Sequence, residues 1–179
     1  MVTSSKDNGL SPMPILDHLN VRLARPEDAA TIASFSAAMA LETEGRRLDL
    51  DRLYDGTIAL LKSPDRGFFM VAELEQADDR QLLGQLMITY EWSDWRNGAF
   101  WWVQSVYVDP RWRRQGLFRR MHQAVVQEAR ARTDVCGVRL YVDKDNTIAH
   151  TTYERLGLIR SAYQVYESDF VLPPQTAKE

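Results

Sequence analysis

The stretch Val103–Arg120, VQSVYVDPRWRRQGLFRR, decides the fold because a strand pattern changes there into a helix pattern. Its first part is β-branched and aromatic, and Asp109-Pro110 ends the strand because proline has no amide hydrogen for a sheet. From Leu117, apolar residues recur at every fourth position, which predicts a helix that begins near Gly116. The first amides of such a helix lack partners within it and lie at its positive end. The junction therefore predicts a phosphate-binding site.

Positive charge is concentrated at this helix start. Five arginines fall between Arg111 and Arg120, whereas the whole chain has a formal net charge of -3. Local positive charge on an acidic protein favours a discrete anionic ligand over nucleic acid, which is usually bound by a basic domain. Gly116 lets the backbone approach such a ligand without a Cβ atom in between. On this segment alone, a turn glycine followed by solvated arginines explains the pattern equally well.

Two blocks of sequence together resemble the GNAT superfamily of N-acetyltransferases. The first is Arg113-x-x-Gly116 after VYVDP, which is similar to the superfamily's loop for acetyl-coenzyme A. The second is DNTIAHTTYERLGL, in which Asn146 and Tyr153 stand at positions of the superfamily's second signature. The blocks occur in the expected order with a strand-like segment between them. Phe118 departs from the pattern, because the loop usually has a small residue there, and this bears on the path of the pyrophosphate.

The resemblance implies an α+β (α/β/α) fold, with a mixed, mostly antiparallel central sheet flanked by helices. Its fourth and fifth strands would run parallel and splay apart, so that unpaired backbone groups can bond the pantetheine arm of the coenzyme. Acetyl-coenzyme A would be the cosubstrate, with its pyrophosphate at the amides of residues 114–119, and no metal is expected. The residues that the resemblance assigns to the coenzyme are Val106, Tyr107, Val108, Arg113, Arg114, Gln115, Gly116, Leu117, Phe118, Arg119, Asn146 and Ala149.

The chain is organised as one domain with two tails. Residues 1–18 are rich in Ser, Pro, Asp and Asn and predict a disordered tail, residues 19–172 predict a single N-acetyltransferase domain, and residues 173–179 a polar tail. The patterns give the order strand, two helices, three antiparallel strands, helix, strand, helix, strand. The last two strands are expected at residues 138–142 and near residues 161–167.

Composition is consistent with a compact enzyme domain. The chain has 179 residues, 45% of them hydrophobic, which is enough for one substantial core. Its single cysteine, Cys136, cannot form an internal disulfide, which suits a reducing compartment. No apolar run is long enough to span a membrane, and no secretory signal is recognisable. The expected location is the cytoplasm, with neither a nucleic acid nor a membrane as partner.

The resemblance also implies that Tyr153 is the general acid, because members of the superfamily often use a tyrosine at the matching position. When an amine has attacked a thioester, the departing thiolate needs a proton, and a phenol with an ordinary pKa of about 10 can deliver it. The alternative is a core tyrosine, because Ala149, Tyr153 and Leu156 share one helix face by spacing. Asn146 is expected to cap the same helix and to lie beside the coenzyme.

Candidates for the general base are less specific. Glu42 and Glu44 lie between the first two predicted helices, and Glu91 ends the third strand. Each is also explained as a surface carboxylate. Among these, Glu42 is the predicted general base, because in the superfamily this region usually covers the acceptor pocket. Glu42 is expected to lie apart from the residues that bind the coenzyme.

Tryptophans are concentrated in the segment that leads into the coenzyme strand. Trp101 and Trp102 are expected on opposite faces of the sheet because side chains alternate along a strand, so one of them belongs to the core. The other, with Trp92 or Trp95, either walls an acceptor pocket or forms a homodimer contact, since large aromatic residues are favoured in both.

Together these patterns predict an enzyme that moves an acetyl group from acetyl-coenzyme A directly to an amine of a small molecule or peptide. A cysteine-linked intermediate is not expected, because Cys136 lies away from both blocks. The alternative is a catalytically inactive module that binds coenzyme A for regulation or interaction. The identity of the acceptor is left open.

Overall fold

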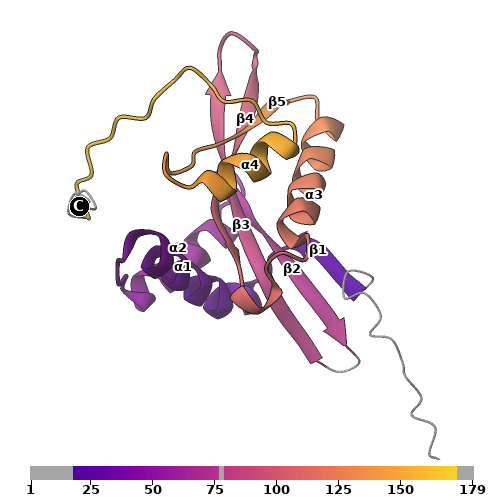
Figure 1. Cartoon of the computed structure of the whole chain (residues 1–179), viewed down its shortest axis with the longest axis vertical. Helices are drawn as coiled ribbons and strands as arrows, with labels where there is room; N and C mark the ends of the chain where they lie inside the picture. The colour runs from indigo at the N-terminus through magenta and orange to yellow at the C-terminus, as the bar shows by residue number, and fades with distance from the viewer. Residues whose placement is uncertain (1–17, 77–78, 173–179) are drawn as a thin grey trace, which may run out of the picture.

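The computed structural model describes residues 18–76 and 79–172 of the chain (Figure 1). The predicted tails, residues 1–18 and 173–179, lie outside these ranges except for His18.

One sheet of five strands forms the centre of the molecule, in the order β1-β2-β3-β4-β5. Neighbours from β1 to β4 are antiparallel, and β5 joins β4 in parallel. The predicted α+β fold with a mixed, mostly antiparallel sheet is therefore confirmed. The strands are β1 (Leu19–Leu23), β2 (Gly67–Gln76), β3 (Asp79–Ser93), β4 (Gly98–Val108) and β5 (Val135–Leu140).

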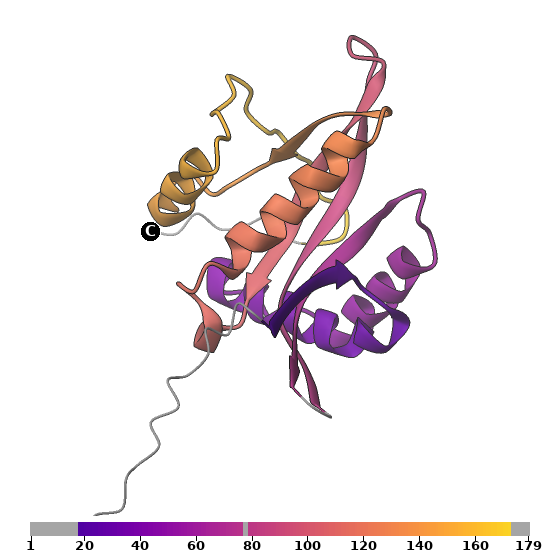
Figure 2. The same cartoon turned by 90° about the vertical axis from the view of Figure 1, so that its right-hand side faces the viewer.

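Helices cover both faces of this sheet. In Figures 1 and 2, α1 and α2 lie on one side of the sheet and α3 on the other, while α4 follows β5. Two short 3-10 helices, η2 and η3, precede α1 and α3. The bounds are η2 (Pro26–Asp28), α1 (Ala29–Glu44), α2 (Leu50–Leu61), η3 (Pro110–Trp112), α3 (Leu117–Ala131) and α4 (Thr147–Arg155).

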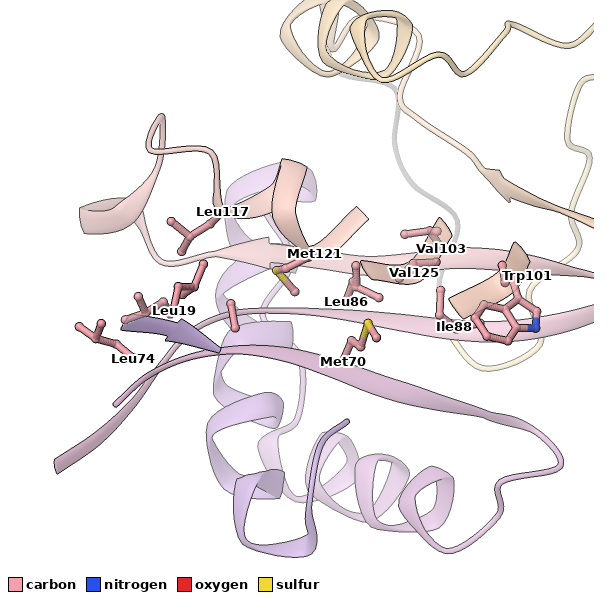
Figure 3. Close-up of a cluster of buried hydrophobic side chains, with 13 residues drawn as sticks. Leu19, Met70, Leu74, Leu86, Ile88, Trp101, Val103, Leu117, Met121 and Val125 are labelled. Atoms are coloured by element: carbon pink, nitrogen blue, oxygen red, sulfur yellow. The ribbon is translucent and has the colours of Figure 1, made fainter. Parts of the chain in front are cut away.

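The larger hydrophobic core lies between the sheet and α3 (Figure 3). Leu117, Met121 and Val125, spaced by four, are almost completely buried on one face of α3. They pack against alternate residues of the strands, among them Trp101 and Val103. The amphipathic helix predicted to begin near Gly116 is therefore confirmed. Of Trp101 and Trp102, one of which was expected in the core, Trp101 is the buried one.

β4 extends beyond its parallel neighbour. Its pairing with β5 runs from Ala99, opposite Val135, to Val103, opposite Leu140. Beyond that point β4 continues to Val108, and no described strand pairs with it on the β5 side. The predicted splay of the fourth and fifth strands is thereby confirmed, and it leaves backbone groups of β4 available on that edge.

A β-bulge lies at the start of this unpaired segment. On the β3 side, Leu86 alone stands opposite both Ser105 and Val106, and Ser105 has a left-handed backbone with φ 48°. A bulge changes which face the following residues point to. Val106 and Val108 therefore pack toward the α3 core, whereas the Tyr107 ring lies 5.1 Å from that of Phe35 in α1.

The last two predicted strands need correction. β5 occupies residues 135–140 instead of 138–142, because the chain leaves the sheet after Leu140. The strand expected at residues 161–167 is wrong: this segment follows α4 as an irregular, exposed chain (Figure 1). Its apolar side chains, such as Val165 and Tyr166, favour a strand locally, but a strand forms only where a neighbour supplies hydrogen bonds.

Candidate functional site

The loop from β4 to α3 leaves the start of the helix accessible. Asp109 begins η3 by accepting a hydrogen bond from the Arg111 amide at 2.9 Å. Arg114 and Gly116 then adopt left-handed backbone conformations, with φ of 63° and 82°. A Cβ atom added at Gly116 would meet no atom within 4 Å. The backbone at Gly116 is therefore open on its Cβ side, and the first amides of α3, which have no partner inside the helix, begin at this point.

A groove of about 290 Å³ lies beside the unpaired segment of β4. It brings together the two sequence blocks, since Arg113 comes from the first and Asn146 from the second. The last turns of α1 form its other wall. Its lining residues are Met39, Glu42, Thr43, Val106, Tyr107, Val108, Arg113 and Asn146.

Glu42 lies within this groove, in contact with residues predicted to bind the coenzyme. Its Oε1 accepts a hydrogen bond from the Tyr107 hydroxyl at 3.2 Å, and its Oε2 lies 2.7 Å from Nη2 of Arg113. Burial and the nearby Glu42 raise the pKa of Tyr107, so its phenol stays protonated. The expectation that Glu42 lies apart from the coenzyme residues is therefore wrong. The cause is tertiary, because α1 ends directly over the bulged end of β4.

The arginines of the loop fall into two groups. Arg113 faces the protein: its Nε donates to the Val108 carbonyl at 2.8 Å, and its guanidinium lies 5.4 Å from the Tyr107 ring centre. Arg114 and Arg119 are exposed and have no ion pair within residues 18–76 and 79–172. The sequence left open whether Arg113 and Arg114 reach phosphate oxygens or face solvent. In the structure Arg113 is engaged within the protein, whereas Arg114 is exposed.

Tyr153 of α4 packs against Phe118 in the first turn of α3. The two rings meet edge to face with centroids 5.6 Å apart, and burial raises the pKa of Tyr153 above its ordinary value. Phe118 also lies 6.0 Å from the ring of His122, whose pKa is lowered by burial. The large residue that departs from the superfamily pattern therefore packs against the second sequence block. Tyr153 itself does not line the groove.

Asn146 caps α4 as predicted. Its Oδ1 accepts a hydrogen bond from the Ala149 amide at 3.0 Å, and its side chain also lines the groove. Ala149 is half-buried in the first turn of the helix. The helix cap expected of Asn146 is thus confirmed, and the same side chain borders the groove beside β4.

Trp102 lies on the face of β4 opposite to Trp101, as alternation predicts. Its indole N–H donates to Glu91, and the other carboxylate oxygen of Glu91 accepts from Arg139 at 2.7 Å. The Arg139 guanidinium lies 3.6 Å from the ring centre of Phe100. Glu91, an alternative candidate for the base, is therefore engaged by two donors.

A second, larger cavity of about 480 Å³ lies between α1, α2 and the sheet. Sequence reasoning missed it, together with Ser36 and Gln85. Gln85 is fully buried, and its Nε2 donates to Ser36 Oγ at 3.0 Å and to the Ser105 carbonyl at 3.5 Å. A polar residue inside the apolar strand LLGQLMI was the available signal. The lining residues are Ser36, Met39, Leu48, Arg52, Leu53, Gly56, Thr57, Ala59, Leu60, Arg66, Phe69, Met87 and Ser105.

Neither a metal centre nor a membrane-spanning helix is found in the part of the chain that the structure describes. No group of three or more His, Cys, Asp or Glu side chains there could hold a metal ion. None of the helices there is long and apolar enough to cross a membrane.

Comparison with known proteins identifies similar chains. The model of the acetyltransferase (GNAT) family matches residues 33–158. The crystal structure of a possible acetyltransferase from Clostridium difficile 630 shares 40% sequence identity, with a TM-score of 0.78, over 86% of this chain and 99% of that one. None of the curated proteins matches the sequence.

Two more distant structures share the fold. One is a predicted acetyltransferase with acetyl-CoA from Clostridium acetobutylicum, with 17% identity and a TM-score of 0.66 over 84% of this chain and 96% of that one. The other is glucosamine-6-phosphate N-acetyltransferase from Arabidopsis thaliana, with 16% identity and a TM-score of 0.61 over 84% and 97% of the two chains.

Proposed function

Because the chain belongs to the GNAT acetyltransferase family, we propose that it transfers the acetyl group of acetyl-coenzyme A directly to an amine. One observation carries this proposal: the groove beside the unpaired end of β4 is lined by residues of both sequence blocks and lies next to the open start of α3. The pantetheine arm of the coenzyme needs an unpaired strand edge, and its pyrophosphate needs a helix start next to that edge.

The residues present fit the coenzyme. The free edge of β4 at Val106 and Val108 would bond the pantetheine arm as an added strand does. The amides of residues 117–119 and the exposed side chains of Arg114 and Arg119 would hold the pyrophosphate. Gly116 supports this assignment, because the space that a side chain would occupy there is open.

Acetyl-coenzyme A supplies an acyl group on a thiolate leaving group. In the transfer, a C–N bond forms, the C–S bond breaks, the amine loses a proton and the thiolate gains one. Tyr153 is assigned as the donor of that proton, since a phenol with an ordinary pKa of about 10, raised further here by burial, is protonated at neutral pH. For Glu42 to act as the base that the sequence predicts, its ion pair with Arg113 would have to open when the acceptor binds.

The coenzyme site can be tested with two glycines of matched conformation. Gly116 and Gly157 have φ of 82° and 86°, and a Cβ at either would meet no atom within 4 Å. Gly116→Trp should therefore block coenzyme A binding in calorimetry, whereas Gly157→Trp, with the same backbone strain, should bind it. Undiminished binding to a folded Gly116→Trp protein would refute the site.

Turnover is tested by release of free thiol from acetyl-coenzyme A with a panel of amines. Amine-dependent release supports the enzyme, and coenzyme binding without release from any amine would favour the inactive module instead. The cytoplasmic location and the homodimer contact stay predictions from the sequence.

A further inference from the structure

We propose that the cavity between α1, α2 and the sheet binds the acceptor, and that it selects amines that carry an apolar body and an anionic group. This inference rests on the proposed function and names the substrate class of the same site. Its grounds are the lining of the cavity, the charges at its rim and its position relative to the groove.

The lining matches an apolar ligand body. Most of the wall consists of aliphatic, thioether and aromatic side chains, including Leu53, Leu60, Phe69 and Met87. A volume of about 480 Å³ lies in the range of about 300 to 1,000 Å³ that is typical of small-molecule sites. An apolar side chain placed there would be removed from water, which is favourable in proportion to its area.

The charges of the cavity are of one sign. Arg52 and Arg66 are the charged residues among those that line it, and both are exposed at its rim. Their guanidinium groups have no acidic partner in the described ranges, whereas Arg113 and Arg139 each pair with a glutamate. Two unpaired guanidinium groups beside an apolar cavity fit a carboxylate or another small anion, which arginine binds through two parallel hydrogen bonds.

The cavity adjoins the groove assigned to the coenzyme. Met39 lines both, and Ser105 of the cavity precedes Val106 of the groove along β4. Gln85 donates to Ser36 and to the Ser105 carbonyl, and both of these residues line the cavity, so this part of the cavity wall has a fixed geometry. An acceptor anchored at Arg52 and Arg66 would thus present its amine toward the β4 bulge, where the acyl group enters.

The test compares pairs of amines that differ by a carboxylate. L-phenylalanine is compared with 2-phenylethylamine, and L-leucine with 3-methylbutylamine, by kcat/KM for acetylation. The carboxylate member of a pair should be preferred, and Arg52→Gln with Arg66→Gln should reduce this preference by roughly tenfold or more, the loss expected for a charge-assisted hydrogen bond. The two amines of a pair differ in basicity, but this difference is the same for every protein. It therefore cancels when the ratio of their kcat/KM values is compared between wild type and variant.

Two further variants sharpen the test. Arg47→Gln removes an exposed arginine of the α1–α2 loop that does not line the cavity, and it should leave the preference unchanged. Gly56→Leu adds a side chain to the cavity wall where a Cβ meets no atom within 4 Å. Because leucine also favours helix over glycine, this variant should stay folded and yet lose acceptor kcat/KM.

The outcomes separate this inference from the proposed function. Equal preference in wild type and in the double arginine variant overturns the acceptor class, as does turnover with other amines of the panel but with neither member of the two pairs. A protein that fails to bind coenzyme A, or that binds it and acetylates no amine of the panel, overturns the proposed function instead. A preference for the carboxylate member that the arginine variant abolishes and Arg47→Gln retains supports the inference.

Discussion

Glu42 and Arg113 form the contact that joins α1 to the loop after β4. The pair is separated by 71 positions in the chain, and its oxygen and nitrogen atoms lie 2.7 Å apart. Both side chains are about 40% exposed (41% for Arg113 and 40% for Glu42), so the ion pair by itself contributes little to folding, about 1 kcal/mol or less. Its effect is local: it holds the Arg113 side chain against the Val108 carbonyl and the Tyr107 ring.

Glu42→Gln should weaken coenzyme A binding as well as turnover. The neutral amide holds Arg113 less firmly, so the groove loses order. The dissociation constant from calorimetry should rise by more than twofold, but by no more than about 1 kcal/mol in free energy. Glu44→Gln is the matched control, because Glu44 pairs with Arg46 and does not line the groove. If coenzyme affinity stays unchanged while acceptor-dependent turnover falls, Glu42 acts on the acceptor and not on the coenzyme site.

Tyr153→Phe should lower kcat by about a hundredfold, the range for general acid catalysis. The ring keeps its contact with Phe118, so coenzyme affinity and stability should change little. Burial raises the pKa of Tyr153 above 10.0, so an alkaline loss of activity caused by this residue lies above pH 10. Rates are measured in single turnover, with Tyr163→Phe, an exposed tyrosine, as control. Equal rates for wild type and Tyr153→Phe would exclude it as the donor.

At the scale of elements, the site depends on where β4 and β5 separate. The bulge at Ser105 reverses the facing of β4, so that Val106 and Val108 continue the α3 core while Tyr107 points toward α1. α4, which carries Tyr153, is a helix of 9 residues. A helix this short is marginal alone, and its stability therefore depends on its cap and its packing.

Asn146→Ala should loosen α4 and reduce turnover. Loss of the hydrogen bond between Asn146 and the Ala149 amide costs about 1 kcal/mol, the usual value for an N-cap. Amide hydrogen exchange in residues 147–155 should accelerate, while exchange in β4 stays slow. Asn146→Ser should behave like the wild type in exchange, because serine is also a good N-cap. No acceleration in the alanine variant would show that packing alone holds α4.

At the scale of the whole molecule, one buried network anchors the edge of the sheet. Arg22 in β1 donates to Asp28 at 2.7 Å and to Glu73 in β2, and all three side chains are largely buried. The hydrogen bond from Arg22 lowers the pKa of Glu73 below its ordinary 4.5. The ionised carboxylate is thus favoured in the folded state. Its stabilisation is fully present above pH 4.5 and is lost as pH falls through the lowered pKa.

Glu73→Gln should lower the free energy of unfolding at pH 7 by about 1 to 3 kcal/mol, because a hydrogen bond to a charged, buried group is lost. Between pH 5 and pH 3 the wild type loses the stabilisation from Glu73, because this carboxylate becomes protonated as pH falls below its ordinary pKa and through its lowered one. The variant lacks this carboxylate and should therefore lose less stability over the same range. Urea unfolding at both pH values measures this. Glu75→Gln, in an exposed pair with Arg80, is the control and should change stability by less than about 0.5 kcal/mol. Parallel pH dependence of wild type and Glu73→Gln would contradict the assignment.

The sequence by itself determined the features that depend on neighbours along the chain. The change of period at Gly116, the break at Asp109-Pro110 and the cap at Asn146 each follow from local backbone preference and were predicted within a few residues. The parallel pairing of β4 with β5 followed from the resemblance carried by the two blocks.

Only the tertiary structure decided the rest of the site. The contact of Glu42 with Arg113, the buried Gln85 and the cavity under α2 arise from residues far apart in sequence, whose meeting depends on how helices pack on the sheet. The same reason explains the failed strand near residues 161–167. Its apolar side chains express a local preference, but a strand is stabilised by hydrogen bonds to a partner, and none of the described strands lies beside it.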